Sequence, residues 1–319
     1  MFIPALAVLL MTPSAEPGSV TFTSDDAKNQ VPERHRLAPH TFSFKMEPEY
    51  NLPYSGVTIS NLRFPSAVKS PYPANNTVYA EYFCPAAPGR YPAAIVLDIL
   101  DGKQVVSRGE ALWLAQNGIA ALVVTMPYYG PRRDGNNLRM VSPDVDHTTA
   151  AFRQAVLDNR RAVAWLASRP EVDTDRLGIV GTSLGSFLAA LTVESEPRLT
   201  SACLLLTGGG LVDAFYGNPK AAPFRKLNEL IGGSKEKLKA LVAPIDPLTY
   251  ADHLKGKRIL FLAASRDDVV PPESCKRLWE AAGKPKIRWF DATHVGAAAY
   301  AFPAMKAVIE HIKGDPTSR

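Results

Sequence analysis

One serine in the sequence has the neighbours that an exposed nucleophilic hydroxyl needs. The segment 181–185 reads GTSLG, matches the pattern G-x-S-x-G, and lies between the apolar run RLGIV and a small-residue helical pattern. A glycine two residues before and after Ser183 allows a strand and a helix to approach closely at a sharp, strained turn. Such a turn exposes the hydroxyl near the positive end of the helix, where developing negative charge is stabilised.

Two later loops supply the base and the acid that a serine nucleophile requires. A serine hydroxyl is a weak nucleophile at neutral pH, so it needs a general base and a third group that orients this base. Asp267 and Asp268 follow the apolar run RILFLAA, and His294 follows the run KIRWF. Because the carboxyl ends of parallel strands meet at one edge of a sheet, these side chains can converge on Ser183. The pattern predicts nucleophilic catalysis by Ser183 with His294 as base.

The elements that must position these residues alternate between strand and helix. Segments 56–64 and 76–84 alternate apolar and polar residues, which is typical of antiparallel strands with one solvated face. Further along, apolar patterns predict strands at 91–100, 119–127, 176–180, 202–208, 258–264 and 286–290, and helices at 110–118, 147–170, from about 184, 277–282 and 303–311. This order predicts an α/β fold: a mainly parallel twisted sheet with helices on both faces and the antiparallel strands at one edge.

Three further segments complete the predicted domain organisation. Residues 1–15 have an apolar core followed by small residues, which fits a signal peptide, although the segment contains no Lys or Arg. We therefore expect export to the periplasm or the medium, with a cytoplasmic location as the alternative. Residues 16–52 are predicted to form an extended arm. Residues 53–319 form one domain with a small cap insertion around 211–257, placed where open α/β sheets bind ligands.

The composition excludes several other classes of protein. The 319 residues are 46% hydrophobic and 21% charged, which suits a globular protein with a sizeable core. The net charge of +5 comes from scattered residues, so we expect no nucleic-acid partner. No segment is long and apolar enough for a stable membrane span. Cys84, Cys203 and Cys275 form no Cys/His cluster, so zinc is not expected, while a disulfide between two of them stays open.

The other histidines have simpler interpretations. His147 begins a long helix after Asp144 and Asp146, and helix N-termini favour Asp for capping, so this cluster predicts a helix start and no metal site. The remaining histidines lack a neighbouring nucleophile and are expected at the surface; they are His35, His40, His253 and His311.

From about Arg90 onward the chain resembles the α/β-hydrolases, specifically the serine esterases related to dienelactone hydrolases and to prolyl-oligopeptidase-like catalytic domains. The resemblance lies in the phrases AVAWLASRPEVDTDRLGIVGTSLG, DPLTYADHLKGKRILFLAASRDDVVPP and THVGA. In that family the acid usually precedes a short V-V-P sequence, which implies Asp267 rather than Asp268. The sharp turn that carries the nucleophile, residues 181–185 in this chain, is called the nucleophile elbow. Dienelactone hydrolases proper have a cysteine at the elbow, so Ser183 implies ordinary ester hydrolysis, with no metal or organic cofactor.

The resemblance also implies which backbone N–H groups stabilise an oxyanion. One donor is Leu184, the residue after the nucleophile. The second comes from the loop after an earlier strand, where the family usually has His-Gly. This chain has LDILDG there, so the second donor is Leu100 or Ile99.

The loop PYYGPRRDG follows the strand predicted at 119–127 and faces the expected substrate pocket. Four of its residues could line that pocket, and a guanidinium group would suit a carboxylate-bearing substrate; they are Tyr128, Tyr129, Arg132 and Arg133. The alternative is a surface loop held by ion pairs.

Taken together, the sequence predicts a serine hydrolase that cleaves small carboxylic esters through an acyl-enzyme intermediate, with a triad of Ser183, Asp267 and His294. Two alternatives stay open. A serine peptidase acting on short peptides is permitted by the resemblance, and a non-catalytic binding protein could retain the fold. The sequence indicates neither the acyl group, nor the alcohol, nor the oligomeric state.

Overall fold

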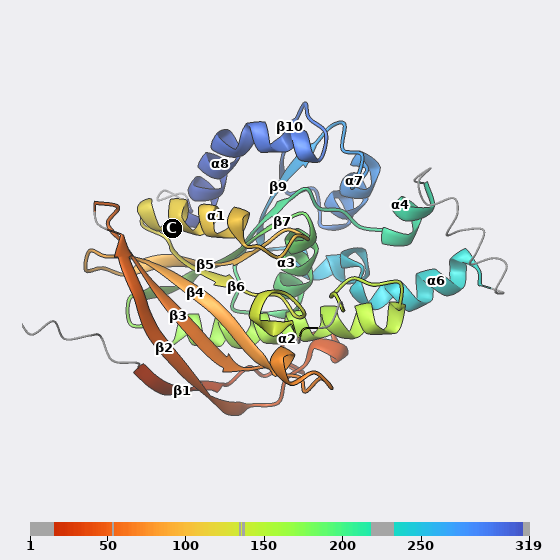
Figure 1. The fold of residues 1–319 in the computed structure, drawn as a ribbon. Coiled ribbons are helices and arrows are strands. Elements are labelled where there is room, and N and C mark those ends of the chain that lie inside the picture. Colours follow the sequence, from red (N-terminus) through yellow and green to blue (C-terminus); the bar gives the residue numbers. More distant parts are fainter. Residues whose placement is uncertain (1–15, 53, 134, 136–137, 218–232, 315–319) are drawn as a thin grey trace, which may run out of the picture.

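A mixed β-sheet with helices on both faces forms the centre of the protein (Figure 1). The computed structural model describes residues 16–52, 54–133, 135, 138–217 and 233–314. Within these residues ten strands pair in the order β1-β2-β3-β4-β6-β5-β7-β8-β9-β10. The pairs from β1 to β6 are antiparallel, and all pairs from β6 to β10 are parallel. The predicted α/β fold with a mainly parallel sheet is confirmed.

The elements have the following bounds. The strands are β1 (Glu16–Phe22), β2 (His40–Leu52), β3 (Val57–Pro65), β4 (Thr77–Pro85), β5 (Tyr91–Leu97), β6 (Ala120–Val124), β7 (Val172–Thr182), β8 (Ser201–Leu205), β9 (Arg258–Ala264) and β10 (Lys286–Phe290). The helices are α1 (Val105–Gln116), α2 (Val145–Ala167), α3 (Leu184–Ser195), α4 (Leu211–Gly217), α6 (Lys235–Val242), α7 (Pro272–Ala281) and α8 (Ala301–Lys313). Short 3-10 helices are η1 (Glu33–His35), η2 (Pro73–Asn76), η3 (Gly130–Arg132), η5 (Ala243–Ile245), η6 (Pro247–Leu254) and η7 (Val295–Tyr300).

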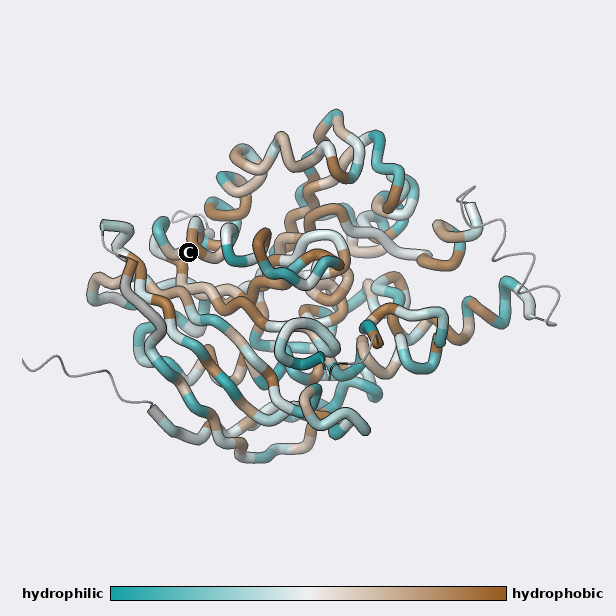
Figure 2. Tube along the Cα trace, viewed as in Figure 1, coloured by the Kyte–Doolittle hydropathy of each residue, from teal (hydrophilic) through white to brown (hydrophobic). Residues whose placement is uncertain are grey.

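The central strands are apolar along their length because helices cover both of their faces. Successive residues of β5 enter two different cores: Ile95 belongs to the core that contains residues of α2 and α3, whereas Val96 belongs to the core that contains residues of α1 and α8. Figure 2 shows hydrophobic residues concentrated in these central strands. A parallel sheet buried on both sides needs such continuous apolar strands. Its carboxyl-terminal edge carries the loops that hold the candidate site.

The N-terminal segment 16–52 is extended, but it is part of the sheet. Strand β1 pairs with β2, and β2 pairs with β3. We expected β3 and β4 at the edge of the sheet, whereas β1 is the edge strand and β3 lies between β2 and β4. The alternation of buried Phe42 and Phe44 with exposed residues explains this, since it gives β2 one face on the core.

His35 corrects another expectation. It lies in η1, is only 1% exposed, and its Nδ1 atom is 2.8 Å from the Ser195 hydroxyl. Burial and nearby arginines lower the pKa of His35 to about 3. The ring is therefore a buried neutral group that fastens the N-terminal segment to α3, and the prediction of a surface position was wrong.

The described part of the segment between β8 and β9 consists of short helices. Its described parts are α4, α6, η5 and η6, and η6 contacts α3 and α7. The Asp246 carboxylate accepts N–H groups of Gly210, Leu211 and Leu248, so it connects the start of α4 with the start of η6. Residues 1–15, where we predicted a signal peptide, lie outside the described residues. No described helix is both long enough and apolar enough to cross a membrane.

Candidate active site

Ser183 lies at the turn between β7 and α3 in a strained backbone conformation. Its φ is +54°, a region that residues with a side chain rarely adopt. A Cβ atom at Gly181 would lie 2.2 Å from the Gly185 carbonyl oxygen, and one at Gly185 would lie 2.3 Å from that of Leu97. The Ser183 N–H donates to the Leu205 carbonyl on β8 at 2.9 Å. Both glycines are therefore required by close backbone approach, as the sequence pattern predicted.

Ser183, His294 and Asp267 form one continuous hydrogen-bonded line. Ser183 Oγ is 2.9 Å from His294 Nε2, and His294 Nδ1 is 2.8 Å from Asp267 Oδ2. A carboxylate can only accept, so Nδ1 carries the ring proton and leaves Nε2 free to accept the serine proton. Asp267 follows β9 and His294 follows β10, which brings both to the sheet edge where Ser183 projects. The arrangement can move a proton from the hydroxyl to the imidazole.

The loop after β9 holds Asp267 rigidly. Its Oδ1 accepts the backbone N–H groups of Val269 at 2.8 Å and Val270 at 2.7 Å, which leaves Oδ2 to His294. Asp267 is 7% exposed, whereas Asp268 is exposed. The geometry therefore joins Asp267, and not Asp268, to the imidazole.

A buried glutamate that the sequence pattern did not predict contacts the residue before the nucleophile. Glu110 on α1 accepts a hydrogen bond from the hydroxyl of Thr182, the residue before the nucleophile, at 2.7 Å. Its other oxygen is buried without a hydrogen-bond partner among the described residues. Burial, with a smaller effect from Asp98, raises the pKa of Glu110 to about 7. The available signal was a charged residue on the apolar helix EALWLAQ.

The predicted backbone donors belong to two segments that meet near Gly185. Leu184 opens α3 directly after Ser183, and its N–H lies at the helix N-terminus. Ile99 and Leu100 belong to the loop that follows β5. This loop touches the elbow, because a Cβ atom at Gly185 would lie only 2.6 Å from the Asp98 carbonyl oxygen.

The loop after β6 differs from the expectation at Arg132. Its guanidinium is completely buried and donates to Asp158 Oδ2 at 2.7 Å and to the backbone carbonyls of Thr125 and Asn75. Such a paired, desolvated group is a structural anchor and is not accessible to a substrate. The predicted role of Arg132 in the pocket was therefore wrong.

The other three predicted pocket residues have different surroundings. Tyr128 and Tyr129 are 7% and 8% exposed, and Arg133 is exposed. The Tyr129 ring lies against Gly102 in the loop after β5, close to the elbow. Of the four residues, Tyr129 is thus the one that the structure connects with the loop of the predicted oxyanion donors.

Other predicted features are placed as follows. Asp144 caps α2 by accepting the His147 N–H at 3.0 Å, and His147 Nε2 is 2.8 Å from the Arg139 carbonyl oxygen. The cysteines are all free thiols, with Cys203 and Cys275 buried and Cys84 partly buried. Within the described ranges no group of three His, Cys, Asp or Glu side chains could hold a metal ion.

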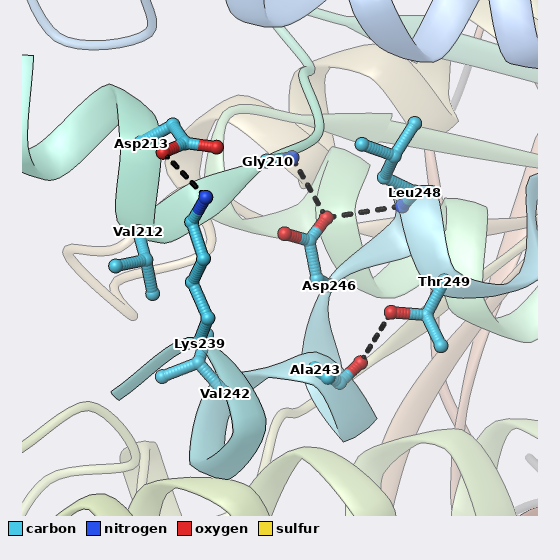
Figure 3. Close-up of a pocket in the computed structure, with 9 residues that line it drawn as sticks. All are labelled: Gly210, Val212, Asp213, Lys239, Val242, Ala243, Asp246, Leu248 and Thr249. Carbon is cyan, nitrogen blue, oxygen red and sulfur yellow. Dashed lines mark hydrogen bonds and ion pairs between the residues drawn. The ribbon is translucent and has the colours of Figure 1, made fainter. Parts of the chain in front are cut away.

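A cavity of about 350 Å³ lies within the segment between β8 and β9, which supplies all of its lining residues (Figure 3). Its lining includes Val212 and Asp213 of α4, Lys239 of α6, and the carboxylate of Asp246. Lys239 points toward Asp213 and forms an ion pair with it at 2.9 Å. None of Ser183, Asp267 and His294 lines this cavity, so it is separate from the hydrogen-bonded line.

Comparison with known proteins places the chain in a structural class. Residues 152–293 match the model of the prolyl oligopeptidase family. The acetyl xylan esterase from Paenibacillus sp. R4 superposes with a TM-score of 0.69 at 20% identity, covering 83% of this chain and 87% of that one. Acetyl xylan esterase 1 from Thermoanaerobacterium sp. JW/SL YS485 superposes with a TM-score of 0.64 at 17% identity, covering 84% and 88%. The protein therefore has the fold of the α/β-hydrolases.

A sequence relative extends this assignment only partly. A Mycobacterium tuberculosis protein of unassigned activity is 31% identical over 190 residues, which are 56% of this chain. This chain spans 43% of the length of that relative. The comparisons therefore establish the fold, and they show a similarity to the prolyl oligopeptidase family over residues 152–293.

Proposed function

We propose that the protein is a carboxylic ester hydrolase that works through an acyl-enzyme intermediate on Ser183. The observation that carries this proposal is the line of two hydrogen bonds, 2.9 and 2.8 Å long, from Ser183 through His294 to Asp267. The strained φ of Ser183 adds support, because the surrounding backbone maintains a costly conformation that exposes the hydroxyl.

In the proposed reaction, His294 Nε2 takes the proton of Ser183 as Oγ attacks the ester carbonyl. Asp267 accepts the Nδ1 hydrogen bond and stabilises the imidazolium that forms. His294 then gives the proton to the departing alcohol. A water molecule, activated by the same imidazole, attacks the acyl-serine and releases the carboxylic acid.

The negative charge of each tetrahedral intermediate falls on the former carbonyl oxygen. Leu184 N–H, at the start of α3, is one proposed donor to this oxygen, and the loop after β5 supplies the second. Such donors act best when they are fixed before the reaction begins, because no reorganisation is then needed in the transition state.

A peptidase acting on short peptides is the second candidate. The match of residues 152–293 to the prolyl oligopeptidase family favours it, since ester and peptide bonds can be cleaved by the same triad chemistry. The similarity in fold to two acetyl xylan esterases favours the ester substrate. The predicted export signal at residues 1–15 remains part of the proposal and is independent of this choice.

A panel of substrates separates the two candidates. We expect turnover of p-nitrophenyl esters across a series of acyl lengths, little turnover of aminoacyl amides, and none of either by Ser183→Ala. Loss of the nucleophile and its proton transfer reduces triad catalysis by about 10⁶-fold. Faster cleavage of amides than of esters would instead support the peptidase, and undiminished turnover by the Ser183→Ala protein would refute both candidates.

A further inference from the structure

The cavity of about 350 Å³ between β8 and β9 combines apolar walls with charged groups (Figure 3). Val212 of α4, Val242 of α6 and Leu248 of η6 supply apolar side chains to its lining. Its volume lies at the lower end of the range for ligand pockets, about 300–1,000 Å³. A cavity of this size holds a molecule of about ten heavy atoms, if each atom takes the space of a water molecule.

The two carboxylates of the lining already have partners. Asp246 accepts three backbone N–H groups, at distances between 2.7 and 3.0 Å. Asp213 forms ion pairs with Lys235 at 2.7 Å and with Lys239 at 2.9 Å. The hydrogen bonds from these two lysines lower the pKa of Asp213, so this carboxyl group is ionised at neutral pH. A cationic ligand would have to displace donors that are already in place.

A third cation lies at the edge of the cavity and is poorly paired. Nη1 of Arg277 on α7 is 4.0 Å from Asp213 Oδ2. The guanidinium lies on the lining residue Gly210, where an added Cβ atom would be 3.2 Å from Nε and Cζ. Nε is buried and makes no hydrogen bond within the described part of the chain. Arg277 therefore has hydrogen-bonding capacity that Asp213 does not use.

We propose that this cavity is a binding site for a small aliphatic carboxylate. The aliphatic chain packs against the apolar walls, and the carboxylate group faces Lys239 and Arg277 at the edge. A guanidinium suits this ligand because its planar N–H groups can donate two parallel hydrogen bonds to a carboxylate. The triad residues do not line the cavity, so the proposal is independent of the proposed ester hydrolysis.

Three ligands separate the apolar part of the site from the charged part. Hexanoate carries both a chain and a charge, acetate carries the charge with a minimal chain, and hexan-1-ol carries the chain alone. Ligand-observed NMR titrations measure the three Kd values. We expect a Kd of about 1 mM for hexanoate, and at least tenfold weaker binding of acetate and of hexan-1-ol. No binding of hexanoate, or binding of either other ligand with the same affinity, would overturn the proposal.

Two variants test whether the cations of this cavity hold the carboxylate. Arg277→Met keeps an apolar stem but loses the guanidinium, so hexanoate should bind about tenfold more weakly while hexan-1-ol binds as before. Lys276→Met is the matched control, because Lys276 precedes Arg277 on α7, pairs with Glu273 and does not line the cavity. It is expected to keep the wild-type affinity. Lys239→Met repeats the test on α6. Unchanged hexanoate binding in both cavity variants would place the anion elsewhere, including at Ser183, and would overturn the proposal.

Asp213→Asn has the opposite expected effect. Asp213 competes with a bound carboxylate for Lys239 and Arg277, so hexanoate should bind this variant about threefold more tightly than the wild-type protein. Asp252→Asn is the control, since Asp252 pairs with Lys255 at 2.6 Å and does not line the cavity. It should bind hexanoate as the wild-type protein does. Weaker binding of hexanoate by Asp213→Asn, with binding of hexan-1-ol unchanged, would contradict the assigned position of the carboxylate.

Discussion

Two buried polar regions of the molecule differ in whether their carboxyl groups are paired with cations. Between the N-terminal segment and α3, the guanidinium of Arg160 forms two hydrogen bonds with Asp26, at 2.6 and 2.7 Å, and one with Glu196 at 3.1 Å. Glu196 also accepts two hydrogen bonds from the side chain of Arg198. Burial opposes the ionisation of Asp26 and Glu196, yet these arginine contacts leave the pKa of both below the ordinary values.

Near Ser183, the buried carboxyls Glu110 and Asp98 accept hydrogen bonds only from neutral donors within the described part of the chain. Glu110 accepts the Thr182 hydroxyl, and Asp98 accepts backbone N–H groups. Burial raises the pKa of both, despite these hydrogen bonds. A fold selected only for stability would pair or replace such groups. We infer that the ion pairs of Arg160 hold chain segments together. The unpaired carboxyls Glu110 and Asp98 instead lower the stability of the fold while they position the backbone around Ser183.

Removing the central cation of the paired region has the largest expected effect on stability. Arg160→Met leaves Asp26 and Glu196 as buried charges with fewer partners, which is expected to lower the free energy of unfolding by about 3–5 kcal/mol. Denaturant unfolding measures the loss. Arg266→Met is the control, since its ion pair with Asp291 has side chains that are 64% and 76% exposed. The Arg266–Asp291 pair is expected to contribute at most about 1 kcal/mol to the free energy of unfolding. Equal losses of unfolding free energy in the two variants would mean that the buried ion pairs of Arg160 stabilise the fold no more than an exposed pair does.

The unpaired region is tested by Glu110→Gln. The ordinary pKa of Glu110 is 4.5 and its folded-state pKa is about 7, so between these pH values the folded protein binds more protons than the unfolded chain. The contribution of Glu110 to the free energy of unfolding therefore falls as pH rises from about 4.5 to 7, by about 3 kcal/mol in total. Glutamine cannot ionise and removes this fall while keeping an acceptor for Thr182.

Free energies of unfolding at pH 5 and pH 8 measure the effect. The wild-type protein should lose more stability between these pH values than Glu110→Gln does. Glu273→Gln, at a glutamate whose side chain is 72% exposed, should follow the wild-type trend. The same pH trend in the wild-type protein and Glu110→Gln would mean that Glu110 is not a buried, unpaired acid.

The same contrast explains which features the sequence could predict. The elbow, the succession of strands β5 to β10 along the chain, and the positions of Ser183, Asp267 and His294 follow from local patterns: a glycine spacing, apolar runs and the loops after them. The choice of Asp267 over Asp268 came from a family pattern, and the two N–H donors of Val269 and Val270 give its physical reason.

Contacts between distant segments could not be predicted in this way. Arg132 looked like a pocket residue because nothing in its neighbourhood shows that it meets Asp158, 26 positions away. Arg160 meets Asp26 across 134 positions, and His35 meets Ser195 across 160. The burial of Asp98 and Glu110 could not be predicted either, since it depends on packing between α1, β5 and the elbow.

Active-site labelling tests the central claim most directly. The wild-type protein is treated with a fluorophosphonate, ester hydrolysis is followed in parallel, and the modified peptide is identified by mass spectrometry. The account predicts one label per chain on Ser183, with activity lost in step with labelling. Inactivation with the label on another residue, or full labelling of Ser183 without loss of ester hydrolysis, would contradict it.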